Sequence, residues 1–241
     1  TALMYPIIMV GFAMLIVALL MTFVVPKLVE VIVEQGGELP MITKALIWVS
    51  EMFQNYILLM ILGAFVALYI FKGWIKTPVG EMKWDHTKLK APLFGDLLQR
   101  IVMARFARTL GTLMGAGVPL LVALDIAKNV VDNAVYSKVI EDARIAIRDG
   151  DSISAPLKRS GWFPPMVTQM IAIGEKTGEV ESMLDNVAEA YENQVEGKVR
   201  RLTTMLEPVM IVVLGIIVAC IVFAVLLPML NMNEALRAGA V

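Results

Sequence analysis

Hydrophobic residues are concentrated in three long segments of the chain. Residues 1–26 contain no charged side chain, and neither do residues 208–233. A third apolar segment, 56–71, is shorter. Because roughly 20 apolar residues let a helix cross a bilayer, the pattern predicts transmembrane helices. Their expected bounds are 1–26, 56–75 and 208–230.

Apolar positions between the second and third segments follow the period of an α-helix. They recur every three or four residues within 101–114 and again within 136–147. The stripe from Val180 to Leu206 has a mean step of about 3.7 residues, which predicts one long helix leading into the third segment. No stretch shows the alternation of a strand. Residues 76–207 are therefore expected to form a helical domain.

Glycine and proline mark the expected ends of these helices. Gly115 would end one helix, and Pro119 could begin the next. Gly174 and Gly178 are expected to set a tight turn between two helices. Pro208 cannot donate a backbone hydrogen bond, so we expect a bend where the long helix enters the third segment.

Lysine and arginine are distributed unequally around the predicted spans. Residues 72–207 hold 18 of the 21 basic side chains, whereas 27–55 hold two. By the positive-inside tendency, the domain 76–207 is expected in the cytoplasm. The loop 27–55 and the tail 231–241 are then expected on the other side. Within that loop an amphipathic helix could lie along the membrane surface or pack against the spans.

Composition excludes several kinds of chemistry. The hydrophobic fraction of 58% is too high for an ordinary soluble domain. With one cysteine, Cys220, and one histidine, His86, the chain has no cysteine- or histidine-based metal site. A net charge of −1 argues against a strongly basic nucleic-acid binder. No nucleophile and base are spaced as in an enzyme. We therefore expect no catalytic residue, metal or cofactor.

An acidic group near the start of the long helix is the candidate partner-binding surface. It consists of Glu175, Glu179, Glu181 and Asp185. One interpretation is structural, because negative side chains stabilise the N-terminus of a helix through its dipole. The other is a rim on the helical domain that binds a partner protein.

The first and third apolar segments resemble each other. Pro6 and Pro26 are 20 residues apart, and so are Pro208 and Pro228. This spacing suggests that the first span closes an earlier repeat, whose cytoplasmic domain would precede residue 1. The alternative, a signal peptide, calls for a shorter apolar region behind a positively charged start.

Two long blocks carry a resemblance to a known family. Residues 104–124 read ARFARTLGTLMGAGVPLLVAL, and residues 163–178 read FPPMVTQMIAIGEKTG. Together with 206–215, they resemble the F-domain of the type II secretion system F and type IV pilus inner-membrane platform family. The similarity extends from Tyr5 to about Leu230. It implies an all-α membrane protein with three transmembrane helices and a cytoplasmic six-helix bundle, lacking the family's first cytoplasmic domain.

The resemblance also implies a function. Such platforms lie in the bacterial inner membrane and couple a cytoplasmic hexameric assembly ATPase to the insertion of pilin or pseudopilin subunits into a fibre. Other inner-membrane assembly components and further copies of the chain are expected partners; nucleic acid is not. Pilus assembly and protein secretion both remain open. The alternative is a membrane permease subunit with a cytoplasmic regulatory domain, which solute flux into liposomes would reveal.

Overall fold

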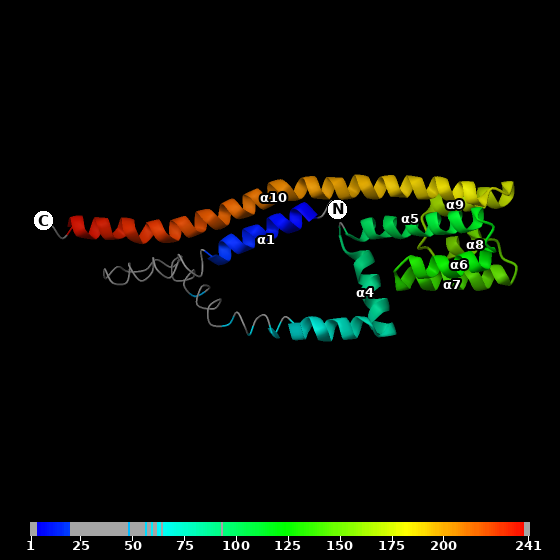
Figure 1. The fold of residues 1–241 in the computed structure, drawn as a ribbon, viewed down its shortest axis with the longest axis horizontal. Coiled ribbons are helices and arrows are strands. Elements are labelled where there is room, and N and C mark those ends of the chain that lie inside the picture. Colours follow the sequence, from blue (N-terminus) through cyan, green and yellow to red (C-terminus); the bar gives the residue numbers. More distant parts are fainter. Residues whose placement is uncertain are drawn as a thin grey trace. The chain divides into compact units, whose positions relative to one another are not determined.

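The computed structural model of the chain describes residues 4–19, 65–92 and 94–238, together with Trp48, Tyr56, Leu59, Leu62 and Gly63. This described part is helical and contains no strand (Figure 1). The chain divides into two units. One comprises residues 1–69 and 200–241, and the other residues 70–199.

The first unit holds the apolar helices. α1 runs from Met4 to Leu19, and the distal part of α10 (Val180–Ala238) covers the predicted third span. By length and composition, α10 is the one described helix able to cross a membrane, within Val180–Cys220, while Phe65–Ile75 is a shorter apolar helix.

Parts of the predicted membrane topology lie outside the described residues. The first and second predicted spans, 1–26 and 56–75, are described only in part. The predicted loop 27–55 is outside except for Trp48, and so are the last three residues of the tail 231–241. These assignments stay predictions.

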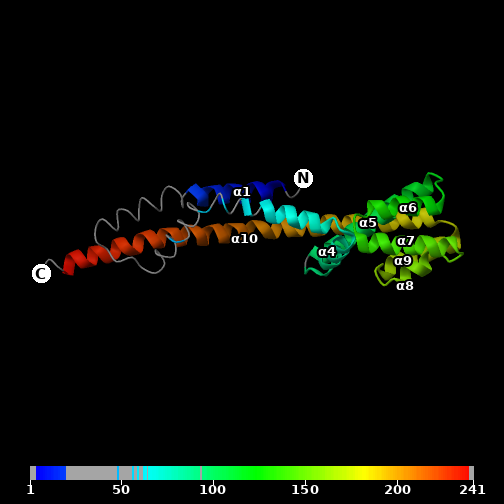
Figure 2. The same ribbon diagram turned by 90° about the horizontal axis from the view of Figure 1, so that it is seen from below.

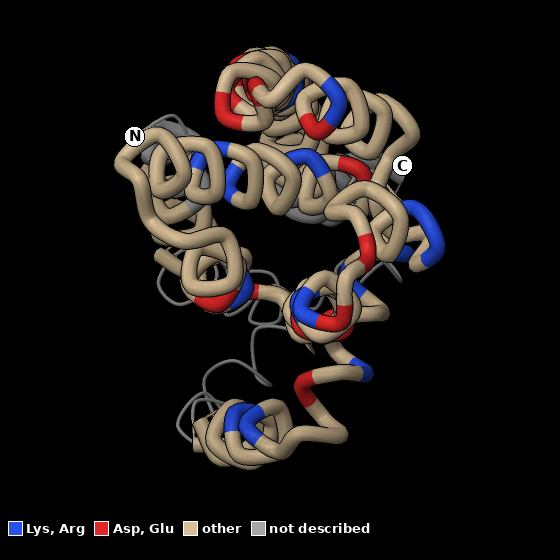
Figure 3. The backbone as a smooth tube through the Cα atoms, turned by 90° about the vertical axis from the view of Figure 1, so that its right-hand side faces the viewer, with Lys and Arg blue, Asp and Glu red and all other residues tan. Residues whose placement is uncertain are grey.

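The second unit gathers helices around the start of α10 (Figure 2). Its complete helices are α4 (Pro78–Lys90), α5 (Phe94–Gly115), α6 (Leu120–Val130), α7 (Ala134–Arg148), α8 (Ser154–Arg159) and α9 (Pro165–Thr177). Neighbours in sequence pack in space, since α5 lies against α6, α6 against α7, and α8 against α9. Acidic and basic positions both occur on its helices (Figure 3).

Caps and breakers account for most of these helix ends. The Thr77 hydroxyl accepts a hydrogen bond from the Gly80 N–H at 3.1 Å and begins α4. The Asn133 side chain accepts from the first turn of α7. α6 begins directly after Pro119, and α5 ends at Gly115. The end of α5 at Gly115 and the start of α6 after Pro119 agree with the predicted signals, whereas α4, α8 and the caps at Thr77 and Asn133 were not predicted.

One hydrophobic core holds the second unit together. Each helix from α5 to α9 contributes buried side chains, and the first turns of α10 close the core. Among its fully buried members are Met103, Phe106, Leu110, Leu124, Tyr136, Ile140, Leu157, Val167, Ile171 and Leu184. Burying large apolar side chains in this way is the main contribution to the stability of such a domain.

A buried carboxylate fastens α4 to the core. Asp85 is only 5% exposed, and its carboxylate accepts a hydrogen bond of 2.7 Å from the Ala134 N–H at the start of α7. Lys88 forms an ion pair with the same side chain at 2.5 Å. A negative group at a helix N-terminus is favoured by the helix dipole, so this contact fixes α4 on α7.

Candidate partner-binding surface

The four acidic residues of the predicted rim differ in exposure, since one is turned into the domain and three are exposed. Glu175, in the last turn of α9, is half-buried and turned into the domain. Its carboxylate accepts from the Ser154 N–H at 3.2 Å, from the Ser154 hydroxyl at 2.6 Å, and from the Ile153 N–H. α8 has no side-chain cap at its own N-cap residue, so Glu175 supplies it. This carboxylate is therefore already engaged within the domain.

The other three acidic residues are exposed on α10 or just before it. Glu179 and Glu181 lie at the first turn, where the helix dipole favours negative charge. Neither forms an ion pair with a described residue. Asp185 lies one turn further on, and Arg108 on α5 forms an ion pair with it at 3.2 Å. The rim available to a partner thus centres on Glu179 and Glu181.

A tight turn holds this rim against α9. Gly178 has φ 78°, a left-handed conformation that a residue with a side chain adopts only at a cost. The N–H groups of Gly178 and Glu179 both donate to the Gly174 carbonyl oxygen. A Cβ on Gly174 would lie 2.7 Å from the Cα of Val180, so the two helices approach too closely for any larger residue there.

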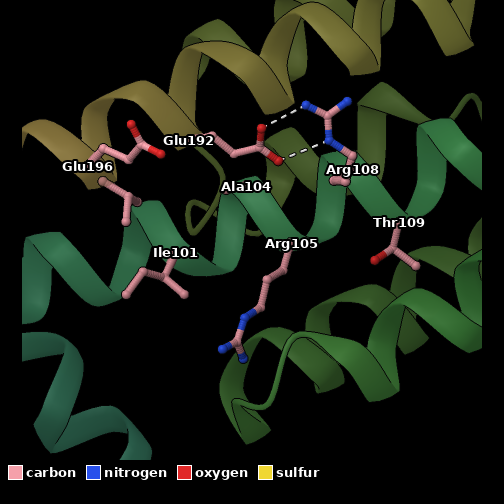
Figure 4. Close-up of a pocket in the computed structure, with 8 residues that line it drawn as sticks. Ile101, Ala104, Arg105, Arg108, Thr109, Glu192 and Glu196 are labelled. Carbon is pink, nitrogen blue, oxygen red and sulfur yellow. Dashed lines mark hydrogen bonds and ion pairs between the residues drawn. The ribbon is translucent and has the colours of Figure 1, made fainter. Parts of the chain in front are cut away.

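Below the rim, a forked ion pair joins α5 to α10. The Arg108 Nε donates to Glu192 at 2.9 Å, and its Nη2 donates to the second carboxylate oxygen at 2.7 Å (Figure 4). Such bidentate pairs fix orientation as well as distance. The hydrogen bonds from Arg108 lower the pKa of Glu192 and those to Glu192 raise the pKa of Arg108. Both groups therefore stay charged near neutral pH.

A second charged cluster joins the same helices. Asp96 on α5 forms an ion pair with Arg100 at 3.0 Å and another with Lys198 on α10. Arg100 also donates to the Gln194 side chain. These pairs are partly exposed, so each contributes little to stability. Together with the Arg108 fork they set the position of α10 on α5 at two levels.

A groove of about 410 Å³ opens beside the Arg108 fork. Its apolar lining comes from Ile101, Ala104 and Val195, and Glu192 and Glu196 line its α10 side. In Figure 4 Arg105 points away from Glu192; its closest acidic partner is Asp132, at 3.9 Å. The groove combines charge of both signs with an apolar floor, which suits a protein surface better than a small reactive molecule.

A second cavity, of about 390 Å³, is lined by Trp162, Phe163 and Tyr191, and Tyr136 and His86 lie beside Trp162. The Tyr136 hydroxyl donates to the Trp162 carbonyl oxygen at 3.2 Å, and burial raises the pKa of Tyr136 to about 12. His86 packs edge-on against the Trp162 ring, with centroids 5.6 Å apart. A phenol kept neutral in this way acts as a structural hydrogen-bond donor.

Ion pairs also link charged side chains on α6 and α7. Glu141 accepts hydrogen bonds from Arg144 at 2.6 Å and from Lys128 at 2.8 Å. These bonds lower the pKa of Glu141 to about 2. Over the residues that the structure describes, no three His, Cys, Asp or Glu side chains are grouped as metal ligands.

The structure places Pro208 inside a continuous helix. α10 extends from Val180 to Ala238 and stays helical through Pro208. This agrees with the long helix predicted from the stripe that begins at Val180. The bend expected at Pro208 stays a prediction.

Sequence reasoning missed Arg108, Glu192 and Asp85. Arg108 lies within the block 104–124 that carries the family resemblance, and 84 residues separate it from Glu192. No local pattern connects positions that far apart. The spacing of Arg100 and Asp96, four residues apart on one helix, is a signal that could have been read.

Comparisons with known proteins bear on the same helices. The family model described as type II secretion system (T2SS), protein F, matches residues 106–228, about half of the chain. This range begins within α5, contains α6 to α9, and ends within α10. It includes Arg108, Glu192 and all four acidic residues of the predicted rim.

Curated relatives come from both pilus and secretion systems. The type IV pilus assembly protein PilC of Thermus thermophilus is 38% identical over 95% of this chain and 57% of its own length. The type II secretion system protein F of Pseudomonas aeruginosa is 35% identical over 97% of this chain and 58% of its own. The type IV pilus assembly protein PilC of Pseudomonas aeruginosa is 34% identical over 97% and 63%. The chain thus spans about three fifths of these relatives. It belongs to the type II secretion system protein F family.

Proposed function

We propose that the chain is an inner-membrane platform of a type IV pilus or type II secretion assembly machine. It couples a cytoplasmic hexameric assembly ATPase to the insertion of pilin or pseudopilin subunits into a fibre. Residues 76–207 lie in the cytoplasm, and further copies of the chain and other inner-membrane components complete the assembly. The observation that carries this proposal is the family match over residues 106–228.

The continuity of α10 supports a mechanical role. Its first turns contribute Leu184, Val187 and Tyr191 to the core of the helical domain. The same helix then continues into an apolar stretch able to cross a membrane. Because one helix serves both, a displacement of the domain acts on the apolar stretch without a flexible linker. Platform proteins need no catalytic site for this.

The exposed acidic rim supports a docking role for the ATPase. Glu179 and Glu181 present carboxylates that form no ion pair with any described residue. Asp185 adds charge that Arg108 neutralises in part. Glu175 is left out of the rim because its carboxylate caps α8. We propose that a basic surface of the ATPase binds Glu179 and Glu181, since charge complementarity speeds and orients association.

The test of the whole function is an in-frame deletion with complementation, scoring pilin processing, surface filaments and protein secretion together. If pilin is still made and cleaved but filaments disappear, the pilus branch is supported. If secretion is lost while filaments persist, the secretion branch is supported. If all three persist without a redundant paralogue, the platform function is wrong.

The test of the rim is charge reversal. The double variant Glu179→Lys, Glu181→Lys is expected to abolish complementation while accumulating to the normal level. A matched variant, Asp142→Lys, Asp149→Lys, changes two exposed carboxylates on and just after α7 and is expected to complement. Equal complementation by both variants would remove the rim from the docking proposal.

A further inference from the structure

A cluster of exposed lysines lies on and before α4. Lys72, Lys76, Lys83 and Lys90 are all exposed, and none forms an ion pair with a described residue. In Figure 3 the helix that precedes α4 carries blue positions and no red one. The exception nearby is Lys88, which Asp85 engages at 2.5 Å. These four lysines thus have no ion-pair partner among the residues that the structure describes.

Large apolar side chains are exposed among these lysines. Trp74 is 45% exposed and Val79 is 65% exposed. Phe71 stacks on Trp74 with centroids 6.2 Å apart and meets the Trp84 ring edge-on at 5.1 Å. Here aromatic and aliphatic groups are exposed beside lysines that form no ion pair with a described residue. They match the amphipathic side chains found where protein meets a bilayer.

The geometry of α4 directs its charge outward. Lys83 and Lys90 are seven residues apart and so share one face of the helix. Asp85, the buried acid of α4, lies on the side that packs against α7. Glu81 is therefore the one exposed acid of α4. Because α4 also packs against α5, the outward face is held rigidly.

We propose that this basic surface, formed by Lys72, Trp74, Lys76, Val79, Lys83 and Lys90, binds the headgroups of anionic phospholipids. The ammonium groups contact lipid phosphates, and the Trp74 and Val79 side chains enter the boundary of the acyl chains. The short apolar helix Phe65–Ile75 contributes Lys72 and Trp74 and leads directly into the rest of the surface. That continuity favours a lipid surface over an acidic protein. The inference rests on the membrane location in the proposed function.

The experiment is native mass spectrometry of the 241-residue chain in detergent, titrated with phosphatidylglycerol and phosphatidylcholine. We expect the chain to retain phosphatidylglycerol in preference to phosphatidylcholine. The triple variant Lys76→Gln, Lys83→Gln, Lys90→Gln is expected to weaken phosphatidylglycerol binding by about a hundredfold, since each lysine near a lipid surface contributes roughly fivefold. Circular dichroism confirms that the variant keeps its helices.

A matched variant provides the control. Lys138→Gln, Lys158→Gln, Lys176→Gln removes the same charge from exposed lysines elsewhere on the domain and is expected to bind as the wild type does. Equal loss in both variants, or none in either, overturns the proposal, as does wild-type binding without preference for phosphatidylglycerol. A failure here concerns a lipid site in the purified chain; a failure of the platform function appears as complete filaments and secretion in the deletion strain.

Discussion

At the scale of single residues, α8 depends on a carboxylate that belongs to another helix. α8 is six residues long and has no side-chain cap at its own N-cap residue. Glu175 provides acceptors for two backbone N–H groups and one hydroxyl there. Backbone donors left without acceptors at a partly buried helix end cost free energy. The stability of the 150–160 region therefore depends on position 175.

Replacing Glu175 is expected to destabilise the domain. Glu175→Ala should lower the free energy of unfolding by about 1–2 kcal/mol, because the cap of α8 is lost. Glu175→Gln keeps one carbonyl oxygen and should cost less. Thermal unfolding of the complete chain in detergent measures the effect, with Glu179→Ala as the control. An unchanged melting temperature for Glu175→Ala would contradict the capping role.

The ion pairs of Glu141 predict a dependence on pH. The pKa of Glu141 falls from its ordinary value of 4.5 to about 2 in the folded chain. A lowered pKa means that the charged form stabilises the folded state. This contribution is complete above pH 4.5 and is lost as the pH falls toward 2. The difference in melting temperature between wild type and Glu141→Gln should shrink over that window. Asp142→Asn serves as the control for a neighbouring exposed carboxylate.

The sequence shows where acidic residues are grouped, but it does not show which of them form contacts inside the domain. The acidic run before and within α10 was found, but nothing local distinguishes Glu175, which turns inward, from Glu179, which stays in water. That difference depends on Ser154, brought near by the packing of α8 on α9. Likewise, the role of Asp85 as a hydrogen-bond acceptor depends on α7, which places the Ala134 N–H beside its carboxylate.

At the scale of elements, the turn between α9 and α10 depends on a close approach. The Cβ of an alanine at position 174 would lie 2.7 Å from the Cα of Val180 and 3.1 Å from its nitrogen. Backbone atoms cannot yield as a flexible side chain does. The first turn of α10, with the exposed rim, is thereby held directly against α9.

Gly174→Ala is therefore expected to force this turn open. We expect a loss of about 1–3 kcal/mol in the free energy of unfolding, as for overpacking elsewhere. Gly197→Ala is the matched control, because a Cβ there meets no atom within 4 Å. In the interior of a helix that control should be neutral or stabilise by up to about 1 kcal/mol. Denaturant unfolding in detergent compares the two variants; similar values would contradict the steric argument.

Most helices of the domain could be predicted from periodicity and breakers. α5, α7 and α9 carry clear apolar stripes and end near a glycine. α4 was not predicted because charged residues interrupt its few apolar positions, so it shows no apolar stripe. α8 was not predicted because six residues are too few to show a helical period, and because its capping side chain lies on another helix.

At the scale of the whole molecule, the proposed coupling runs along α10. The helix continues through Pro208, whose missing N–H removes one backbone hydrogen bond between the core-forming turns and the apolar stretch. We expect this local weakness to let the two parts of the helix bend against each other. We expect this flexibility to be needed when fibre subunits are inserted.

Pro208→Ala restores the missing donor and should stiffen the helix. The variant is expected to accumulate normally, or to be more stable, yet to assemble fewer filaments or secrete less in the complementation assay. Val209→Ala is the neighbouring control, because Val209 is exposed and its replacement leaves the backbone hydrogen bonds unchanged. Normal filaments with Pro208→Ala would count against transmission through this point.

The position of α10 at the end of the domain also constrains the order of events during synthesis. The core stays incomplete until the first turns of α10 have left the ribosome. These turns contribute Leu184, Val187, Ala188 and Tyr191. α8 likewise waits for Glu175, which is made 21 residues after Ser154. A nascent chain that stops before these positions exposes apolar surface that the finished domain hides. Since α10 then continues into its apolar stretch, we expect the domain to close shortly before the predicted third span emerges.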